Sequence, residues 1–375
     1  MTRQSNAISR RSFAQFLGAG AAFAALNPTV SSSMTRAEKF MRPLVNGNVR
    51  LSSNENPYGP SQAAFAAMND AFKLAWRYPD EHEEPLTEEL ARINNVKVEN
   101  IIIGAGSSEV LKLATQSFSG PNKKVVMADP TFESVGQHAR ATGAEVAKIK
   151  LTDNFSHDLT KMAAVQDAGF IYVCNPNNPT ASITPKAEIR SFLRKVGPGT
   201  IVMVDEAYHH YVETSDYESV MPLVKQYPNL IVARTFSKIY GMAGLRCGYC
   251  VAQPALLEKM KVHKFFDSIS ILTLAAAYAS LKDQSQVDNG RRLNAEAKKY
   301  VYTELDKKGY RFIPSSANFL MIDIRKPVKP VIQAMRDNKV DVGRVFPALP
   351  NHLRVTIGTM AEMQAFVTAF NKVMA

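Results

Sequence analysis

The sequence predicts an α/β fold in which a larger domain with a mainly parallel, doubly wound sheet is followed by a smaller α+β domain. From about residue 100, short β-branched runs alternate with helix-length amphipathic segments, and this alternation is typical of βαβ units. A chain of 375 residues, 46% hydrophobic and 21% charged, is long enough for two such domains. No run of 18 or more apolar residues occurs, which argues against a conventional membrane span.

Seven short apolar runs are the predicted strands of the larger domain. They are residues 101–103, 124–127, 145–149, 170–174, 201–204, 230–232 and 248–251. Segments 107–118 and 185–196, which lie between strands, have the periodicity of amphipathic helices. In a doubly wound sheet ligands bind beyond the carboxyl ends of the strands. The polar residues that follow these runs are therefore the candidates for a functional site.

The chain divides into four predicted segments. They are an export signal at 1–34, an irregular N-terminal arm at 35–60, the larger domain at 61–269 and the smaller domain at 270–375. A helical connector is expected at 254–282. The smaller domain is expected to contain strands within 309–324 and 354–358 and a closing helix at 362–373.

The chain is basic, with 45 Lys+Arg against 34 Asp+Glu and a formal net charge of +11. A nucleic-acid-binding function would also require a clustered basic helix, a zinc pattern or an aromatic-basic platform. None of these patterns is present in the sequence. We therefore attribute the charge to a scattered basic surface with a few arginines directed at anionic ligands.

Cys247 and Cys250 form a C-x-x-C pattern within an apparent strand. Residues three apart on a strand lie roughly 10 Å apart and point to opposite faces, which is too far for a disulfide. The sequence therefore predicts that both cysteines pack in the core. No metal site is predicted.

The N-terminus resembles a twin-arginine export signal. Arg10 and Arg11 precede an uncharged apolar stretch at 13–26 that is rich in Ala and Gly. Ala22-Phe23-Ala24 provides a small-residue cleavage site. The sequence therefore predicts an exported, periplasmic protein that uses the twin-arginine translocation machinery. The alternative is an amphipathic N-terminal helix on a cytoplasmic protein.

Lys238 is the residue on which the predicted chemistry depends. It ends the run Arg234-Thr-Phe-Ser-Lys238 and is followed by Ala243-Gly-Leu-Arg246. A lysine between hydroxyl groups and an arginine is placed to form a Schiff base with an aldehyde cofactor that carries a phosphate, and pyridoxal phosphate fits this description. A lone lysine in a Ser/Thr loop is most often a surface residue. The prediction therefore depends on groups elsewhere in the chain.

Further groups follow other strands. Asp205 directly follows the run 201–204, and its carboxylate there can pair with a pyridinium nitrogen. An Asp after a strand is also a common helix N-cap. Tyr208 and Asn178 could each hydrogen-bond the phenolic oxygen of the cofactor. Gly104-Ala-Gly-Ser-Ser108 joins a strand to a helix and presents free N–H groups to an anion such as phosphate.

These motifs, in this order, resemble the fold-type I pyridoxal-phosphate aminotransferases, and within them the histidinol-phosphate aminotransferase family. The resemblance covers roughly residues 50–375. The motifs that carry it are Asn54-Glu-Asn-Pro-Tyr58, Arg77-Tyr-Pro79, Asn177-Asn-Pro-Thr180, Val204-Asp-Glu-Ala-Tyr208, Arg234-Thr-Phe-Ser-Lys238, Ala243-Gly-Leu-Arg246 and Leu353-Arg-Val-Thr-Ile-Gly358.

The resemblance implies roles for the cofactor-binding residues. Lys238 would be the Schiff-base lysine and the catalytic base, and Asp205 the partner of the pyridinium nitrogen. Asn178 and Tyr208 would bind the phenolic oxygen, and Phe132 would stack on the ring. The phosphate would be held by Ala105, Gly106, Ser107, Thr235, Ser237 and Arg246.

The resemblance also implies a homodimer with shared active sites, because Tyr78 would reach the cofactor phosphate of the neighbouring subunit. Arg354 would bind the anionic group of the substrate, with Arg344 and Tyr58 in the same pocket; arginine suits this role because its planar fork binds carboxylate or phosphate oxygens in pairs. Two positions depart from the family pattern. Ala181 replaces a glycine, and Phe132 replaces a tyrosine.

The predicted activity is transfer of an amino group to a 2-oxo acid such as 2-oxoglutarate. The donor would be an amino acid or an amino-alcohol phosphate, and the resemblance implies histidinol phosphate. Export argues against this donor, because histidine biosynthesis is cytoplasmic. Two alternatives therefore stay open. One is an exported aminotransferase for another amino acid, for example an aromatic one, and the other is a decarboxylase on the same scaffold. The full set of cofactor-binding groups argues against a non-catalytic binding protein with this fold.

Overall fold

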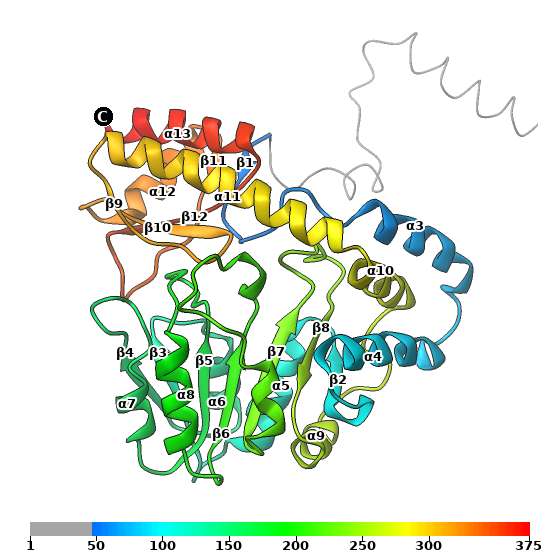
Figure 1. Ribbon diagram of the computed structural model, residues 1–375. Helices are drawn as coiled ribbons and strands as arrows, with labels where there is room; N and C mark the ends of the chain where they lie inside the picture. Colours follow the sequence, from blue (N-terminus) through cyan, green and yellow to red (C-terminus); the bar gives the residue numbers. More distant parts are fainter. Residues whose placement is uncertain (1–46) are drawn as a thin grey trace, which may run out of the picture. The chain divides into compact units, whose positions relative to one another are not determined.

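The structure is a computed structural model that describes residues 47–375 (Figure 1). The predicted export signal at 1–34 and the first part of the predicted arm lie outside the described residues. Residues 48–375 form one compact unit. Within residues 47–375, no helix is both long and apolar enough to span a bilayer.

The main sheet has seven strands in the order β2-β8-β7-β6-β5-β3-β4. They are β2 (Ile101–Gly104), β3 (Lys124–Asp129), β4 (Val146–Lys150), β5 (Ala168–Cys174), β6 (Ile201–Asp205), β7 (Leu230–Thr235) and β8 (Gly248–Val251). Strands β4, β3, β5, β6 and β7 are mutually parallel, and β8 is antiparallel to both of its neighbours. The predicted mainly parallel α/β sheet is confirmed.

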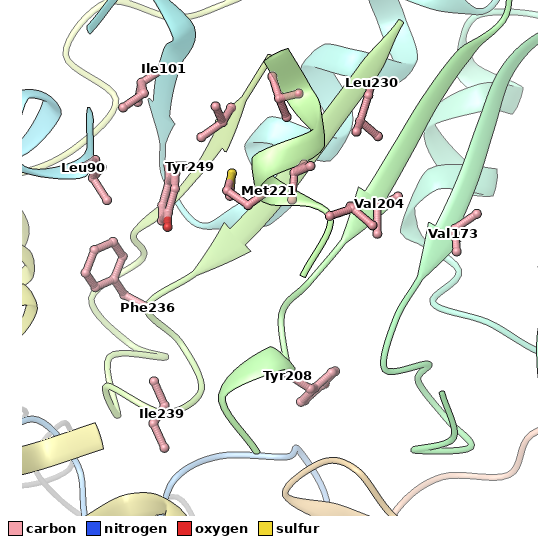
Figure 2. Packing of buried hydrophobic residues seen from close by; sticks show 14 of the residues in the cluster. Leu90, Ile101, Val173, Val204, Tyr208, Met221, Leu230, Phe236, Ile239 and Tyr249 are labelled. Carbon is pink, nitrogen blue, oxygen red and sulfur yellow. The ribbon is translucent and has the colours of Figure 1, made fainter. Parts of the chain in front are cut away.

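Helices cover both faces of this sheet, so its central strands are buried at nearly every position. Figure 1 shows α7 (Leu159–Ala163) and α8 (Lys186–Lys195) in front and α5 (Ser107–Phe118) and α6 (Ser134–Ala141) behind. Side chains alternate between the two resulting cores with the period of two that a strand requires. Figure 2 shows Val173, Val204 and Leu230, which belong to one of these cores.

Cys247 and Cys250 lie in the two different cores of the main sheet. Both are free and buried. The prediction that this pair packs in the core and forms no disulfide is confirmed.

The second sheet is antiparallel, with the order β12-β10-β9. Its strands are β9 (Arg311–Ile313), β10 (Phe319–Asp323) and β12 (His352–Thr356), and the helices packed with it are α11 (Gln284–Lys307), α12 (Val328–Asp337) and α13 (Met360–Met374). The helix α13 begins at a capping box, in which the Thr359 side chain accepts from the Glu362 N–H and the Glu362 carboxylate accepts from the Thr359 N–H.

The described part of the arm packs with the second sheet and forms a small sheet of its own with β11. Strand β1 (Val49–Arg50) pairs in parallel with β11 (Val340–Asp341), and Leu51 lies in the core of the second sheet. This pairing fixes residues 51–54, which follow β1, near the carboxyl end of the main sheet.

The predicted connector consists of two helices, α9 (Pro254–Lys261) and α10 (Ile271–Lys282). Helix α10 packs against α3 (Gln62–Ala71) and α4 (Asp80–Asn94) and contributes to a core of the main sheet. The change of core occurs within α11, in which Val287 packs with the main sheet and Ala297 with the second. The domain boundary at 270 stays a prediction.

Ala181 has a left-handed backbone conformation, with φ +59°, and is fully buried. A glycine would adopt this conformation at no steric cost because it has no Cβ. The expectation that this loop needs an unusual φ angle is confirmed, and the alanine is held by the hydrogen bond from its N–H to the Asn177 carbonyl at 2.7 Å.

Candidate active site

A cavity of about 300 Å³ opens at the carboxyl ends of β5, β6 and β7. Eleven of the predicted site residues line it: Ser107, Phe132, Asn178, Asp205, Tyr208, Thr235, Ser237, Lys238, Arg246, Arg344 and Arg354. Ala105, Gly106, Tyr58 and Tyr78 do not line it. The structure therefore brings together groups that are up to 247 positions apart in the sequence, from Ser107 to Arg354.

Lys238 lies in the turn that follows β7, and its amine is buried in the cavity. The Nζ atom donates to the Asn54 carbonyl at 3.0 Å and lies 5.4 Å from the centre of the Tyr208 ring. Burial lowers the pKa of Lys238 to about 8, and the positive charge of Arg354 acts in the same direction. A substantial neutral fraction near neutral pH makes this amine a nucleophile, which an unperturbed lysine is not.

Asp205 is the last residue of β6 and is 3% exposed. Burial raises the pKa of Asp205 to about 6, and hydrogen bonds from the Tyr172 hydroxyl at 2.8 Å and the Ala207 N–H at 3.1 Å oppose this shift. A buried carboxylate gains much from a cationic partner, because ion pairing offsets the cost of desolvation. The site therefore favours a protonated ring nitrogen beside Asp205.

Tyr208 and Asn178 are held by residues from the second sheet and the arm. The Tyr208 hydroxyl accepts from Asn54 Nδ2 at 3.2 Å, and its ring packs edge-on against Phe319 with centroids 5.1 Å apart. Asn178 Oδ1 accepts from Arg354 Nη1 at 2.8 Å. Within residues 47–375, neither Asn178 Nδ2 nor the Tyr208 hydroxyl donates to another group, so both can donate to a phenolate oxygen.

The amino terminus of α5 and the turn after β7 form an anion-binding cradle. Gly106, with φ +79°, is the N-cap residue that precedes α5 and provides no side-chain cap, so the first N–H groups of the helix can bind a ligand. Arg246 Nη1 donates to Ser237 Oγ at 3.2 Å, and Thr235 Oγ1 donates to the same oxygen at 3.0 Å. Hydroxyls, a guanidinium and a helix amino terminus are a strong donor set for phosphate.

Glycine is favoured at position 106 because the backbone has φ +79° and because the Arg246 side chain lies where a Cβ would be. A Cβ on Gly106 would lie 2.1 Å from Arg246 Nη2. The N–H of Ala105 donates to Glu109 Oε2 at 2.5 Å, and the phosphate-binding role of Ala105 stays a prediction. Gly106 thus shapes the cradle by its absent side chain.

Two arginines lie on the substrate side of the cavity. Arg354 in β12 is 9% exposed, and its Nη2 donates to the Ser52 carbonyl at 2.7 Å. Burial lowers the pKa of Arg354 to about 10. Arg344 is more exposed, donates to Glu133 Oε2 at 2.8 Å and lies over the Phe346 ring at 4.4 Å.

Tyr58 and Tyr78 lie outside the cavity, with 45% and 79% of their surfaces exposed. The predicted role of Tyr78 concerns the site of a neighbouring subunit. That role requires an exposed side chain in the single chain, and the exposure is consistent with it.

Several lining residues were not predicted, notably Asn54, Thr131, Cys174 and Phe346. Tyr172, which holds Asp205, was also missed. The sequence places Tyr172 and Cys174 two residues apart in a predicted strand, and therefore on one face, but the pairing of Cys174 with Asp205 is seen only in the structure. Asn54 belongs to the motif Asn54-Glu-Asn-Pro-Tyr58, but its place in the cavity depends on long-range contacts of the arm with Thr356 and Asn318.

Known proteins resemble this chain in sequence and fold. The family described as aminotransferase class I and II matches residues 46–370. A histidinol-phosphate aminotransferase from Moorella thermoacetica is 38% identical over 344 residues, which cover 90% of this chain and 89% of that protein. The solved histidinol-phosphate aminotransferase from Sinorhizobium meliloti, in complex with pyridoxal-5'-phosphate, is 26% identical with a TM-score of 0.79, covering 87% of this chain and 90% of that chain.

A further solved structure has a similar fold. The solved structure of a candidate histidinol-phosphate aminotransferase from Erwinia carotovora atroseptica has a TM-score of 0.84 and 32% identity, and covers 87% of this chain and 95% of that chain.

The fold and the site define a fold-type I pyridoxal-phosphate-dependent transferase, in which an amine, a buried carboxylate and a phosphate cradle meet beyond the carboxyl ends of a mainly parallel sheet. The chain belongs to the class I and II aminotransferases. It is therefore a pyridoxal-phosphate-dependent enzyme that acts on an amino donor and an oxo acid.

The residues present fit this cofactor. Lys238 would supply the amine for its aldehyde, Asp205 a carboxylate for its ring nitrogen, and the cradle at Gly106 the donors for its phosphate. The bound cofactor supplies an electron sink for the carbanion that forms when a substrate loses a proton.

Replacing Asp205 with Asn is expected to stabilise the cofactor-free protein at alkaline pH. The pKa of Asp205 is about 6 in the folded state against about 3.9 unfolded. The folded state therefore binds more protons between these values, and wild-type stability falls as the pH rises from about 4 through 6. At pH 8 the variant should be more stable by up to about 3 kcal/mol, and near pH 4 this advantage should vanish.

Urea unfolding of the cofactor-free proteins at pH 4, 6 and 8 measures this difference, and Asp153→Asn at an exposed position is the control. A gain in the free energy of unfolding of Asp205→Asn that does not depend on pH would contradict the raised pKa of Asp205. The same variant with cofactor should lose at least about ten- to a hundredfold in turnover, because an amide cannot keep the ring nitrogen protonated.

Proposed function

We propose that the enzyme takes an amino donor that carries an anionic group, in first place histidinol phosphate, and transfers its amino group to a 2-oxo acid such as 2-oxoglutarate. The observation that carries this proposal is the buried Arg354, which lines the same cavity as Lys238. A desolvated arginine binds a phosphate or carboxylate in paired hydrogen bonds. Relatives named as histidinol-phosphate aminotransferases support the choice of donor.

Each side chain has a defined task in this reaction. The neutral amine of Lys238 removes the proton from the α-carbon of the bound donor as a general base, and the ammonium so formed can return a proton. Asp205 keeps the ring nitrogen protonated, and Asn178 and Tyr208 orient the ring through its phenolic oxygen. Arg354 holds the anionic group of the donor, so that the α-carbon lies next to Lys238.

A second candidate donor is an aromatic amino acid. Phe132 and Phe346 both line the cavity, and aromatic rings favour an aromatic side chain in contact with them. A decarboxylase activity is the third candidate. It would release carbon dioxide and need no oxo acid, so a screen of donors with and without 2-oxoglutarate separates it from amino transfer.

We further propose a homodimer in which Tyr78 serves the site of the partner subunit, a role supported by its exposure in the single chain. Mixing Tyr78→Phe chains with Lys238→Ala chains tests this role. After subunit exchange one site of the hybrid can contain both native side chains, and recovered activity would support sharing.

Lys238 is expected to carry the cofactor. Borohydride reduction should fix the cofactor mass on the peptide that contains Lys238. Because burial lowers the pKa of Lys238 to about 8, the rate of cofactor attachment to the cofactor-free protein should rise with pH and level off above about pH 8. Peptide mass spectrometry and stopped-flow absorbance measure these two results. An adduct on a different lysine would show that the assignment is wrong.

Replacing Arg354 with Ala should raise the Michaelis constant for anionic donors by about ten- to a thousandfold. The cofactor should bind almost as tightly as before, because its phosphate has a separate cradle. The measurement compares histidinol phosphate with its unphosphorylated analogue histidinol in wild type and variant. Equal losses with both donors would show that Arg354 supports the site only through Asn178 and the Ser52 carbonyl.

We propose export through the twin-arginine pathway on the basis of Arg10 and Arg11. A double Arg10→Lys, Arg11→Lys substitution should leave the protein in the cytoplasm, because a receptor reads the arginines themselves and lysine preserves only their charge. Cell fractionation measures the distribution. Equal periplasmic amounts of both proteins, or wild type found only in the cytoplasm, would reject this pathway.

A further inference from the structure

Tyr172 is a fully buried tyrosine near the carboxyl end of β5. Its ring packs with Cys174 and Met203 in the core that the main sheet forms with α5 and α6. Tyr172 does not line the active-site cavity. Any effect of this side chain on a bound ligand must therefore pass through another residue.

The Tyr172 hydroxyl contacts Asp205. It donates to Asp205 Oδ2 at 2.8 Å. The register of the sheet explains this contact, because Tyr172 pairs with Met203, and Asp205 lies two residues further along β6 on the same face. The Ala207 N–H donates to the other oxygen, Oδ1, at 3.1 Å. Each carboxylate oxygen thus has one donor from the protein and can accept another from the cavity, which Asp205 lines.

This hydrogen bond favours the ionised form of Asp205. A carboxylate can only accept, and a donor that faces it stabilises its charge. Burial has the larger and opposite effect and raises the pKa of Asp205 to about 6, while the bond from Tyr172 lowers the pKa. The phenol keeps its proton, because burial raises the pKa of Tyr172 well above its ordinary value.

Other charged and titratable groups also act on Asp205. They are Cys174, Glu206, Tyr208 and Lys238. The positive charge of Lys238 favours the carboxylate, and the negative charge of Glu206 opposes it. Among the described residues, none of these four groups donates a hydrogen bond to the carboxylate, and Tyr172 is the side chain that does.

We propose that Tyr172 is a positioning residue for amino transfer, which holds Asp205 as a carboxylate and fixes the orientation of its two oxygens toward the cavity. The proposal rests on the proposed function, in which Asp205 keeps the ring nitrogen protonated. A carboxylate that accepts a hydrogen bond is less basic, so the proton between it and a ring nitrogen stays on the nitrogen. Without the phenol the carboxylate is more basic, and this proton moves toward Asp205.

Tyr172→Phe removes the hydroxyl and keeps the ring. In the cofactor-free protein this change should raise the pH at which Asp205 ionises by about one to two pH units, because hydrogen bonds to charged groups are the strong ones. The folded variant then holds its extra proton to higher pH than wild type does. Its stability relative to wild type should therefore fall as the pH rises from 5 to 8.

A double-mutant cycle isolates this effect. Urea unfolding at pH 5 and 8 compares wild type, Tyr172→Phe, Asp205→Asn and the double variant, all without cofactor. The loss of stability caused by Tyr172→Phe should grow with pH when Asp205 is present and be the same at both pH values in the Asp205→Asn background. Tyr302→Phe is the control, because the Tyr302 hydroxyl accepts from the Ser315 N–H at 2.8 Å and Tyr302 does not line the cavity.

A second variant tests the opposite direction. Tyr172→3-fluorotyrosine keeps the hydroxyl and makes it more acidic, so that it donates a stronger hydrogen bond. The pH at which Asp205 ionises should then fall below the wild-type value, as measured by the same unfolding experiment. This variant decides the question if Tyr172→Phe does not fold.

The cofactor-loaded enzyme shows whether the hydrogen bond serves the reaction. Tyr172→Phe should lower kcat by about three- to thirtyfold. The Michaelis constant for the donor should stay within about twofold, because Arg354 is unchanged. Tyr302→Phe should leave both constants near their wild-type values. A general loosening of the structure would not produce this separation of kcat from the Michaelis constant.

The proposal is wrong if the effect of Tyr172→Phe on stability does not depend on pH, if the effect is the same with and without Asp205, or if kcat does not change. The unfolding cycle needs neither cofactor nor substrate. It therefore decides whether Tyr172 holds the carboxylate even if wild type transferred no amino group, a result that would reject the proposed function alone.

Discussion

Burial of opposite charges in one cavity is the constraint on which the rest of the structure depends. Lys238, Asp205 and Arg354 are all held away from water, and each has a pKa displaced toward its neutral form by burial. Desolvated charges cost free energy that only close partners offset. A rigid scaffold must therefore hold donors and acceptors in place before any ligand arrives, which is the preorganisation that catalysis requires.

The main sheet supplies this rigidity at the ends of β6 and β7. Glu206, next to Asp205, is 1% exposed and accepts two hydrogen bonds from Arg234, at 3.0 and 2.9 Å, and one from Ser219 at 2.8 Å. Losing one member of such a buried pair would leave an uncompensated charge. The pair fixes the loop after β6 to β7, and thereby the distance between the segments that carry Asp205 and Lys238.

The fold and most of the cofactor cavity follow from local signals in the sequence. Strands such as 201–204 are apolar runs followed by a polar residue, and parallel packing brings such residues to one edge. What the sequence could not show depends on long-range contacts. Asn54 reaches the cavity through the pairing of β1 with β11 and through hydrogen bonds with Thr356 and Asn318, and the N–H of Ala105 is bonded to Glu109.

Asn54 joins the two halves of the site. Its carbonyl accepts from Lys238 Nζ at 3.0 Å and from Asn318 Nδ2 at 3.1 Å, and its N–H donates to Thr356 at 2.9 Å. Asn318 and Thr356 belong to the second sheet region, whereas Lys238 follows the main sheet. A shift of the second sheet would therefore move the acceptor of the Lys238 amine and Arg354 together, so that binding an anion at Arg354 and positioning the amine that removes the α-proton are mechanically linked.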